Sequence, residues 1–170
     1  VLFLALIAAL VLVPMWKRVL ELSKLGKGES AIVLTAQNSN PLYIDAATHA
    51  ALELGAKVFS VERQKLLYDK TKLLLPFAGY HGAKLVYGDG YKGLPRFAPF
   101  DKVMVTAAAP YIPNDLLQQL KVGGEMIIPL GEGAVQQMIW LKKTSPTGFD
   151  RKELGKFRFV PLLQDKAADQ

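Results

Sequence analysis

The sequence has no cysteine among its 170 residues, which excludes disulfide frameworks, thiolate zinc sites, iron–sulfur clusters and cysteine nucleophiles. It has only two histidines, His49 and His81, so we expect no histidine-built metal site and interpret both as structural or solvated residues. A strong charge of one sign is also lacking. The 21 Lys and Arg exceed the 15 Asp and Glu by 6 and are scattered, which favours a solvated basic surface over nucleic-acid binding.

Apolar residues make up 51% of the chain and charged residues 21%, a balance typical of a globular protein with a hydrophobic core. A chain of 170 residues is long enough for one ordinary domain and short for two. We therefore expect a single domain over residues 1–170, with an apolar helical segment over residues 1–25 and an α/β core over residues 26–170.

An unbroken apolar run occupies Val1–Trp16 and is followed by Lys17 and Arg18. The run is shorter than the about 20 residues that a transmembrane helix needs, and Pro14 would disturb its end. It also lacks the basic start and the small-residue cleavage site of a signal peptide. We interpret it as a buried helix, with a membrane or exported segment and an interface helix as the alternatives, and we expect a cytoplasmic protein.

Short β-type runs alternate with helical patterns along most of the chain, as is typical of βαβ units. This order predicts a mainly parallel, doubly wound sheet with helices on both faces. The last two strands have no helix between them, which predicts an antiparallel edge. The expected strands are Ala31–Thr35, Lys57–Glu62, Leu85–Tyr87, Asp101–Thr106, Glu125–Pro129, Gln136–Lys142 and Lys156–Pro161. The expected helices are Leu42–Leu54, Arg63–Leu75, with a stripe of leucines, and Asn114–Leu120.

Two acidic residues follow neighbouring strands, at the edge where a doubly wound sheet binds its ligand. Glu62 ends the second strand, where nucleotide-binding folds keep an acid that accepts hydrogen bonds from ribose hydroxyls. Asp89 follows the third strand between Gly88 and Gly90, which allow a close backbone approach while the carboxylate accepts from an exocyclic amine. The structural alternatives are a solvated glutamate beside Arg63 and a plain Gly-Asp-Gly turn.

The stretch Thr106–Pro110 follows the fourth strand and reads Thr-Ala-Ala-Ala-Pro. Its small side chains are expected to leave the backbone exposed at the mouth of the site, which would suit a second substrate that must come close. A tight strand-to-helix turn would use the same residues.

The segment Gly55–Gly133 contains the motifs YGDGY, APFD, VTAAAP and LKVGG in this order, and FVPL follows within Phe157–Leu163. With these motifs the chain resembles the protein-L-isoaspartate (D-aspartate) O-methyltransferases over roughly two-thirds of its length. The resemblance implies a Rossmann-like methyltransferase fold and S-adenosylmethionine as cofactor. It also implies methylation of the free carboxyl of L-isoaspartyl residues in damaged proteins, with such proteins or peptides as partners and no metal.

The resemblance also implies roles for individual residues. Glu62 would hold the cofactor's ribose, and Asp89 with Gly90 would lie at the adenine. The peptide substrate would be lined by Thr106, Ala107, Ala108 and Pro110. At the cofactor's methionyl end, the corresponding loop offers Thr35, Asn38 and Ser39.

The N-terminal third departs from the family pattern at two functional positions. The family's first strand ends in a glycine-rich GxGxG loop, whereas Thr35–Asn40 contains no glycine. The family's hydroxyl motif would align before Pro14, where this chain has Val11-Leu12-Val13, so no catalytic residue is assigned. Three interpretations follow: an enzyme with a remodelled loop, a catalytically silent module used for binding or assembly, or a grafted or misassigned N-terminal segment. A nicotinamide-dependent oxidoreductase would also use Glu62, but it needs the missing glycine fingerprint as well.

Overall fold

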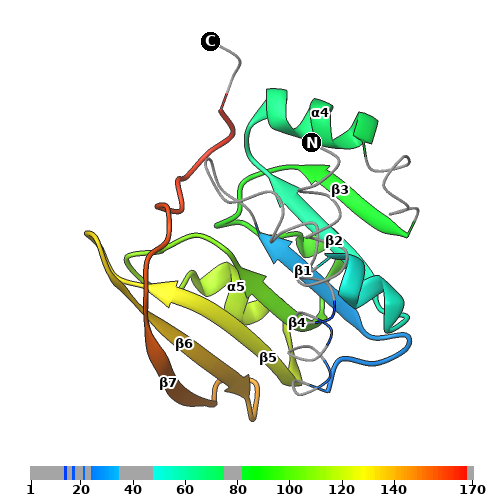
Figure 1. Ribbon diagram of the computed structural model, residues 1–170. Helices are drawn as coiled ribbons and strands as arrows, with labels where there is room; N and C mark the ends of the chain where they lie inside the picture. Colours follow the sequence, from blue (N-terminus) through cyan, green and yellow to red (C-terminus); the bar gives the residue numbers. More distant parts are fainter. Residues whose placement is uncertain are drawn as a thin grey trace.

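The computed structural model describes residues 14, 17, 21, 24–34, 48–74 and 82–167. The described strands form a seven-stranded sheet in the order β3-β2-β1-β4-β5-β6-β7 (Figure 1). The strands are β1 (Ser30–Leu34), β2 (Lys57–Glu62), β3 (Ala83–Tyr87), β4 (Phe100–Val105), β5 (Leu120–Leu130), β6 (Gln136–Lys143) and β7 (Phe149–Phe157), and the helices are α4 (Lys65–Leu74) and α5 (Asn114–Gln118), with a 3-10 turn at Pro95–Phe97.

The sheet is parallel from β3 to β5 and antiparallel beyond it. β1 pairs in parallel with β2 and β4, β2 with β3, and β4 with β5. β6 runs antiparallel to β5, and β7 antiparallel to β6. The predicted Rossmann-like sheet with an antiparallel edge is therefore confirmed. Because the five parallel strands point the same way, their carboxyl ends share one edge of the sheet.

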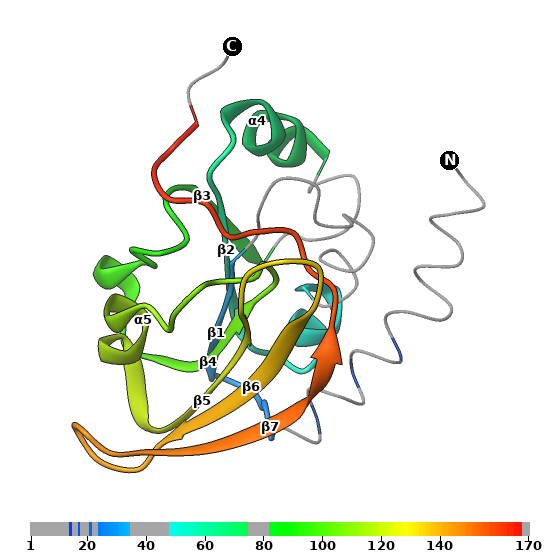
Figure 2. The same cartoon turned by 90° about the vertical axis from the view of Figure 1, so that its left-hand side faces the viewer.

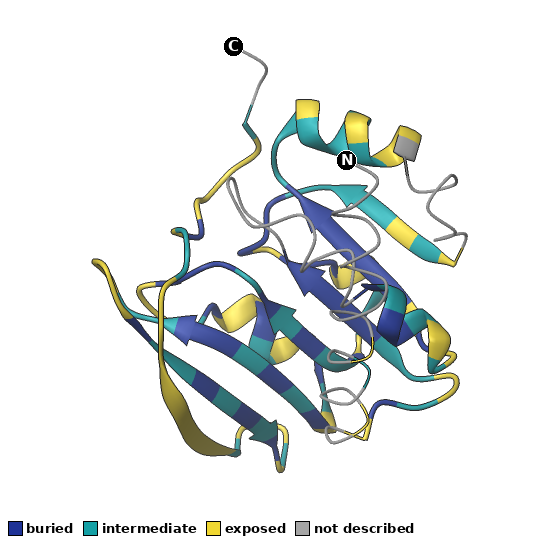
Figure 3. Cartoon of the chain, in the orientation of Figure 1, coloured by how far each residue is buried: buried dark blue, intermediate teal, exposed yellow. Residues whose placement is uncertain are grey.

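β1 is buried on both of its faces, and its alternate residues point to opposite sides of the sheet. Ile32 and Leu34 of β1 pack in one buried cluster with α5. Ala31 and Val33 pack in a second cluster with the helical residues 48–53. Figure 2 shows α5 and these helical residues on opposite sides of β1, and Figure 3 shows β1 and β2 buried along most of their length.

The last strand lies earlier in the chain than predicted. The sequence predicts a strand over Lys156–Pro161, whereas β7 spans Phe149–Phe157. Nearly all of β7 is exposed (Figure 3), so it carries charged residues and lacks the apolar alternation that marks a buried strand. Residues 158–167, the C-terminal strap, leave the sheet and cross the carboxyl ends of the parallel strands (Figures 1 and 2). There the strap forms an isolated bridge between Ala108 and Pro161.

The helices differ from the prediction mainly at their ends. α4 begins at Lys65, and the leucine stripe is partly open to solvent, since Leu66 and Leu73 are each 72% exposed. The predicted helix over Leu42–Leu54 is helical over residues 48–53, and its first part lies outside the described residues, as does the apolar run Val1–Val13. None of the helices described is long and apolar enough to cross a membrane.

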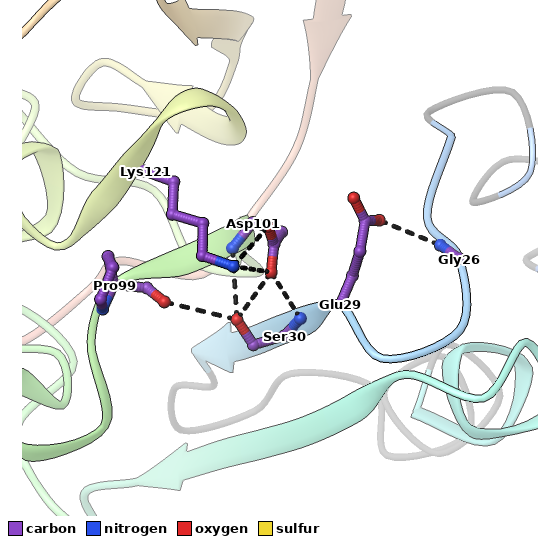
Figure 4. A network of polar contacts seen from close by, with 6 residues as sticks. All are labelled: Gly26, Glu29, Ser30, Pro99, Asp101 and Lys121. Atoms are coloured by element: carbon purple, nitrogen blue, oxygen red, sulfur yellow. Dashed lines mark hydrogen bonds and ion pairs between the residues drawn. The ribbon is translucent and has the colours of Figure 1, made fainter.

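A polar network joins three strands at the opposite, amino-terminal edge of the sheet (Figure 4). One oxygen of Asp101, on β4, accepts hydrogen bonds from the backbone N of Ser30 at 2.7 Å and from its hydroxyl at 2.9 Å. The ammonium of Lys121, on β5, donates to both carboxylate oxygens at 2.7 Å. Nearby, Glu29 accepts from the backbone N of Gly26 and closes the turn before β1. The network ties β1, β4 and β5 together far from the carboxyl edge.

Candidate functional site

Glu62 is the last residue of β2 and is only 7% exposed, although it lies at the edge of the sheet. Its Oε1 accepts a hydrogen bond from the backbone N of Gln64 at 2.8 Å. Its backbone oxygen accepts from the N of Gly88 at 3.0 Å, which joins the end of β2 to the loop after β3. A side chain at Gly88 would press on Val61, since a Cβ there would lie 3.2 Å from Val61 Cγ1. The glycine therefore lets the two strand ends approach closely.

Asp89 is also buried, at 6% exposure, and both of its carboxylate oxygens are held by backbone donors. Oδ1 accepts from the N of Tyr91 at 2.8 Å, and Oδ2 accepts from the N of Asp165 in the strap at 3.0 Å. An ionised carboxylate has about four lone-pair sites, so each oxygen can accept one further donor. A Cβ at Gly90 would lie 3.2 Å from Leu162 Cδ1, which shows that the strap packs directly on this turn.

Tyr91 connects the same turn to the strap. Its hydroxyl donates to the backbone oxygen of Leu162 at 3.3 Å. Burial raises the pKa of the Tyr91 phenol, and the nearby Tyr111, Asp89 and Glu132 raise it further. The phenol therefore stays protonated at neutral pH and remains a donor to the strap.

The alanine loop after β4 is closed, which corrects the expectation of exposed backbone. Ala107, Ala108 and Ala109 are at most 5% exposed. Ala108 N donates to Val160 O, and Leu162 N donates to Ala108 O, each at 2.7 Å. The backbone of Ala109 pairs in the same way with the end of β5. The strap and the end of β5 thus pair with the backbone of Ala108 and Ala109, and the Thr-Ala-Ala-Ala-Pro segment by itself does not reveal these partners.

The ends of the alanine loop differ from its centre. The Thr106 hydroxyl donates to the backbone oxygen of Leu34 at 2.6 Å, which fixes the end of β4 against the end of β1. At the far end, Pro110 is exposed and Tyr111 is 53% exposed. The part of this segment that a second molecule can reach is therefore its ends.

The far end of the strap is held by groups at the ends of β2 and β3. The Arg63 guanidinium donates to Asp165 O at 2.9 Å and to Gln164 O at 3.3 Å. The backbone oxygen of Arg63 accepts from Ala167 N at 3.0 Å, and the Tyr87 hydroxyl donates to Ala167 O at 2.9 Å. These contacts place the strap over the same strand ends that carry Glu62 and Asp89.

Replacing Arg63 by methionine should loosen the strap without unfolding the domain. Two side-chain hydrogen bonds of about 1 kcal/mol each are lost, while the sheet keeps all of its pairings. We expect amide exchange of Asp165 and Ala167 to accelerate by about tenfold, with the midpoint of thermal unfolding almost unchanged. Hydrogen exchange followed by NMR measures this. Unchanged protection of both amides would contradict the assignment of Arg63 as an anchor of the strap.

A pocket of about 290 Å³ opens beside Asp89, between the turn after β3, the start of α5 and the strap. Its lining combines acidic groups with aromatic rings: Asp89, Asp115 and Asp165 with Tyr91 and Tyr111. Such a lining can accept hydrogen bonds from amines and hydroxyls while a planar group packs on the rings.

The described residues therefore bring together Glu62, Asp89, Gly90 and the loop after β4 at one edge of the sheet. Thr35, Asn38 and Ser39, which were predicted at the methionyl end, lie outside the described residues, as does His81. His49 lies on the helical residues 48–53, and its Nε2 is 3.2 Å from Glu53 Oε1 at the surface. Within the described ranges, no cluster of three or more acidic or histidine side chains is placed to hold a metal ion. Sequence reasoning missed the strap, whose first residues, 158–161, were predicted as part of a strand.

Comparison with a family model gives a match over residues 10–167, and the model describes protein-L-isoaspartate(D-aspartate) O-methyltransferases. Among curated relatives, the protein-L-isoaspartate O-methyltransferase of Christiangramia forsetii is 54% identical over 113 residues, which is 66% of this chain and 53% of the relative. The enzyme of the same name from Flavobacterium johnsoniae is 54% identical over the same shares. The chain thus spans about half the length of the curated relatives it matches.

Solved structures of the same kind share the fold. A protein-L-isoaspartate O-methyltransferase aligns with a TM-score of 0.75 at 25% identity, over 89% of this chain and 47% of the other. A Plasmodium falciparum protein described as such an enzyme, in complex with S-adenosyl-L-homocysteine, aligns with a TM-score of 0.71 at 21% identity, over 88% and 72%.

Proposed function

The chain belongs to the protein-L-isoaspartate (D-aspartate) O-methyltransferase family, and we propose that it uses S-adenosylmethionine to methylate the free carboxyl of L-isoaspartyl residues in damaged proteins. Its partners are then isoaspartyl-containing proteins or peptides, and the activity is protein repair. A cytoplasmic location and a single domain over residues 1–170 stay predictions from the sequence.

The observation that carries this proposal is the pair of buried carboxylates at adjacent strand ends. Glu62 on β2 is paired with Tyr87 on β3. Asp89 follows Tyr87 by two residues, so it lies just past the strand end that carries Glu62. Both carboxylates are buried and oriented by backbone N–H groups. When bound, S-adenosylmethionine supplies a methyl group on a sulfonium sulfur. Its ribose hydroxyls and exocyclic amine are donors of the kind that Glu62 and Asp89 accept.

The other residues predicted for the site complete the proposal. Asp89 and Gly90 lie at the adenine, and Thr35, Asn38 and Ser39 serve the methionyl end. Thr106, Ala107, Ala108 and Pro110 form the wall on the substrate side, where the exposed Pro110 offers the contact and the buried alanines hold the wall against β5 and the strap. An isoaspartyl carboxyl is ionised at neutral pH, so the reaction needs no strong general base. Positioning of the two reactants then supplies most of the catalysis.

A methyl-transfer assay tests the proposal directly. Purified protein is incubated with methyl-labelled S-adenosylmethionine and a peptide that contains one L-isoaspartyl residue, and the same peptide with an ordinary aspartyl residue is the control. We expect labelling of the isoaspartyl peptide alone, as an ester that base hydrolyses. Equal labelling of both peptides would contradict the proposed specificity. Binding of S-adenosylhomocysteine without any transfer would support the alternative of a catalytically silent binding module.

A further inference from the structure

The turn that carries Asp89 is wound tightly over residues 88–94. Lys92 N donates to Asp89 O at 3.2 Å, and Gly93 N donates to Gly90 O at 3.3 Å, so two successive turns overlap. The Asp89 side chain adds its bond to Tyr91 N inside the first turn. The direction of the Asp89 carboxylate is thus coupled to the path of the chain as it leaves the turn toward Leu94.

Gln119, at the end of α5, holds that outgoing path with its side-chain amide. Its Oε1 accepts from Leu94 N at 2.7 Å, and its Nε2 donates to Lys92 O at 2.8 Å. Its backbone oxygen also accepts from Phe100 N, at the start of β4, at 2.8 Å. The residue is 7% exposed. One buried glutamine therefore links α5, β4 and the turn after β3.

Gly93 shows that the turn and Gln119 fit each other closely. Its φ of +57° lies in the region that glycine adopts most easily. A Cβ on Gly93 would lie 2.5 Å from Gln119 Oε1 and 2.8 Å from Leu116 Cδ2. The glutamine amide thus occupies the space that any other residue at position 93 would need.

We propose that Gln119 is a positioning residue for Asp89, which sets the direction of its carboxylate toward the adenine amine of the cofactor. The inference rests on the proposed function, because it assigns a role within the cofactor site. Gln119 acts through the turn and does not itself touch the cofactor. Loss of the Gln119 amide lets residues 91–94 relax, so that the Asp89 carboxylate loses its fixed direction. The effect falls on cofactor affinity, because Gln119 bonds to the turn after β3, whereas the proposed peptide contact at Pro110 follows β4.

The test replaces Gln119 by methionine, which keeps the length of the side chain but removes both amide bonds. We expect the Kd for S-adenosylhomocysteine, measured by calorimetry, to rise about tenfold. The KM for an isoaspartyl peptide at saturating S-adenosylmethionine should stay within about twofold of the parent value. Unchanged affinity for S-adenosylhomocysteine in a folded variant would overturn the inference.

Lys143, the last residue of β6, provides a matched control because its side chain contacts the same end of α5. It is also 7% exposed, and its ammonium donates to Leu117 O and Leu120 O, each at 2.9 Å, on either side of Gln119. Lys143→Met thus removes two hydrogen bonds, one at the end of α5 and one at the start of β5, and leaves the turn after β3 intact. We expect it to lower the thermal midpoint without weakening S-adenosylhomocysteine binding. If both variants weakened S-adenosylhomocysteine binding equally, the cause would be the packing of α5, and the positioning role of Gln119 would be overturned.

Amide exchange of the ligand-free protein separates this inference from the proposed function. Tyr91 N donates to Asp89 Oδ1, so its protection reports whether the carboxylate is held in place. Gln119→Met should lower that protection, whereas Lys143→Met should not. If the parent protein failed to bind S-adenosylhomocysteine, the proposed function would fail, and the role in the cofactor site would fail with it. If Tyr91 stayed equally protected in both variants, the positioning role would be wrong even with binding intact.

Discussion

Replacing Asp89 by alanine is expected to weaken S-adenosylhomocysteine binding roughly 10- to 150-fold, the value of a charge-assisted hydrogen bond of about 1.5–3 kcal/mol. The carboxylate is buried, and two backbone N–H groups hold it in a fixed direction. Binding of an amine by Asp89 therefore carries little entropic cost, because the side chain is already ordered. Alanine removes the acceptor and leaves the backbone donors of Tyr91, which is buried, and Asp165 without it.

The measurement is a calorimetric titration of the parent protein and the Asp89→Ala variant with S-adenosylhomocysteine. Asp89→Asn is the second variant, because it preserves the volume and one acceptor for Tyr91 while it removes the charge. Asp150→Ala, in the exposed strand β7, is the control and should bind like the parent protein. If both Asp89 variants fold and bind as tightly as the parent, Asp89 does not recognise the cofactor.

Replacing Asp101 by asparagine is expected to lower the free energy of unfolding by about 2–4 kcal/mol at neutral pH. The Asp101 side chain is 15% exposed and accepts from Ser30 and from Lys121. Asparagine has a single acceptor oxygen, so its NH₂ group must face one of the present donors. Because the carboxylate joins β1, β4 and β5, the loss weakens the centre of the sheet (Figure 4).

The same change should make stability less dependent on pH in acid. Burial alone would raise the pKa of the Asp101 carboxyl, but hydrogen bonds from Lys121 and Ser30 outweigh burial and hold the pKa below its ordinary value of 3.8. A carboxyl with a lowered folded pKa stabilises the protein above its unfolded pKa. That stabilisation is lost as the pH falls through the lower, folded pKa. The difference between the parent protein and Asp101→Asn should therefore shrink below about pH 4.

Urea unfolding at neutral pH and at several acidic pH values measures both effects. Asp69→Asn is the matched control, since Asp69 on α4 pairs with Lys65 but its side chain is 49% exposed. An exposed ion pair contributes about 1 kcal/mol or less to the free energy of unfolding. The free energy of unfolding of Asp69→Asn should therefore stay close to that of the parent protein. An Asp101→Asn variant as stable as the control would show that the network at the amino-terminal edge does not stabilise the sheet.

Local patterns predicted most of the sheet but not its last strand. β2 matches its predicted bounds, β4 differs by one residue at each end, and β1 begins one residue earlier than predicted. In each strand apolar residues are concentrated between turn residues, which is the signal that located it. β7 was missed because both of its faces are exposed and its residues are mostly charged. The strand predicted over Lys156–Pro161 includes the first four residues of the strap, 158–161, which do not belong to the sheet. Leu162 packs instead on Gly90 in the turn after β3, whereas Leu163 is 40% exposed.

By itself, the sequence determined the order of the elements, the doubly wound sheet and the two acidic positions at its carboxyl edge, Glu62 and Asp89. These depend on short-range signals: apolar runs, glycine turns and the rule that places a ligand beyond parallel strands. Only the tertiary structure decided what orients and covers those positions. Gln119 meets Leu94 across 25 residues of sequence and Arg63 meets Asp165 across 102, and no local pattern encodes contacts of such separation. The alanine loop is closed for the same reason, because its partners come from β5 and from the strap.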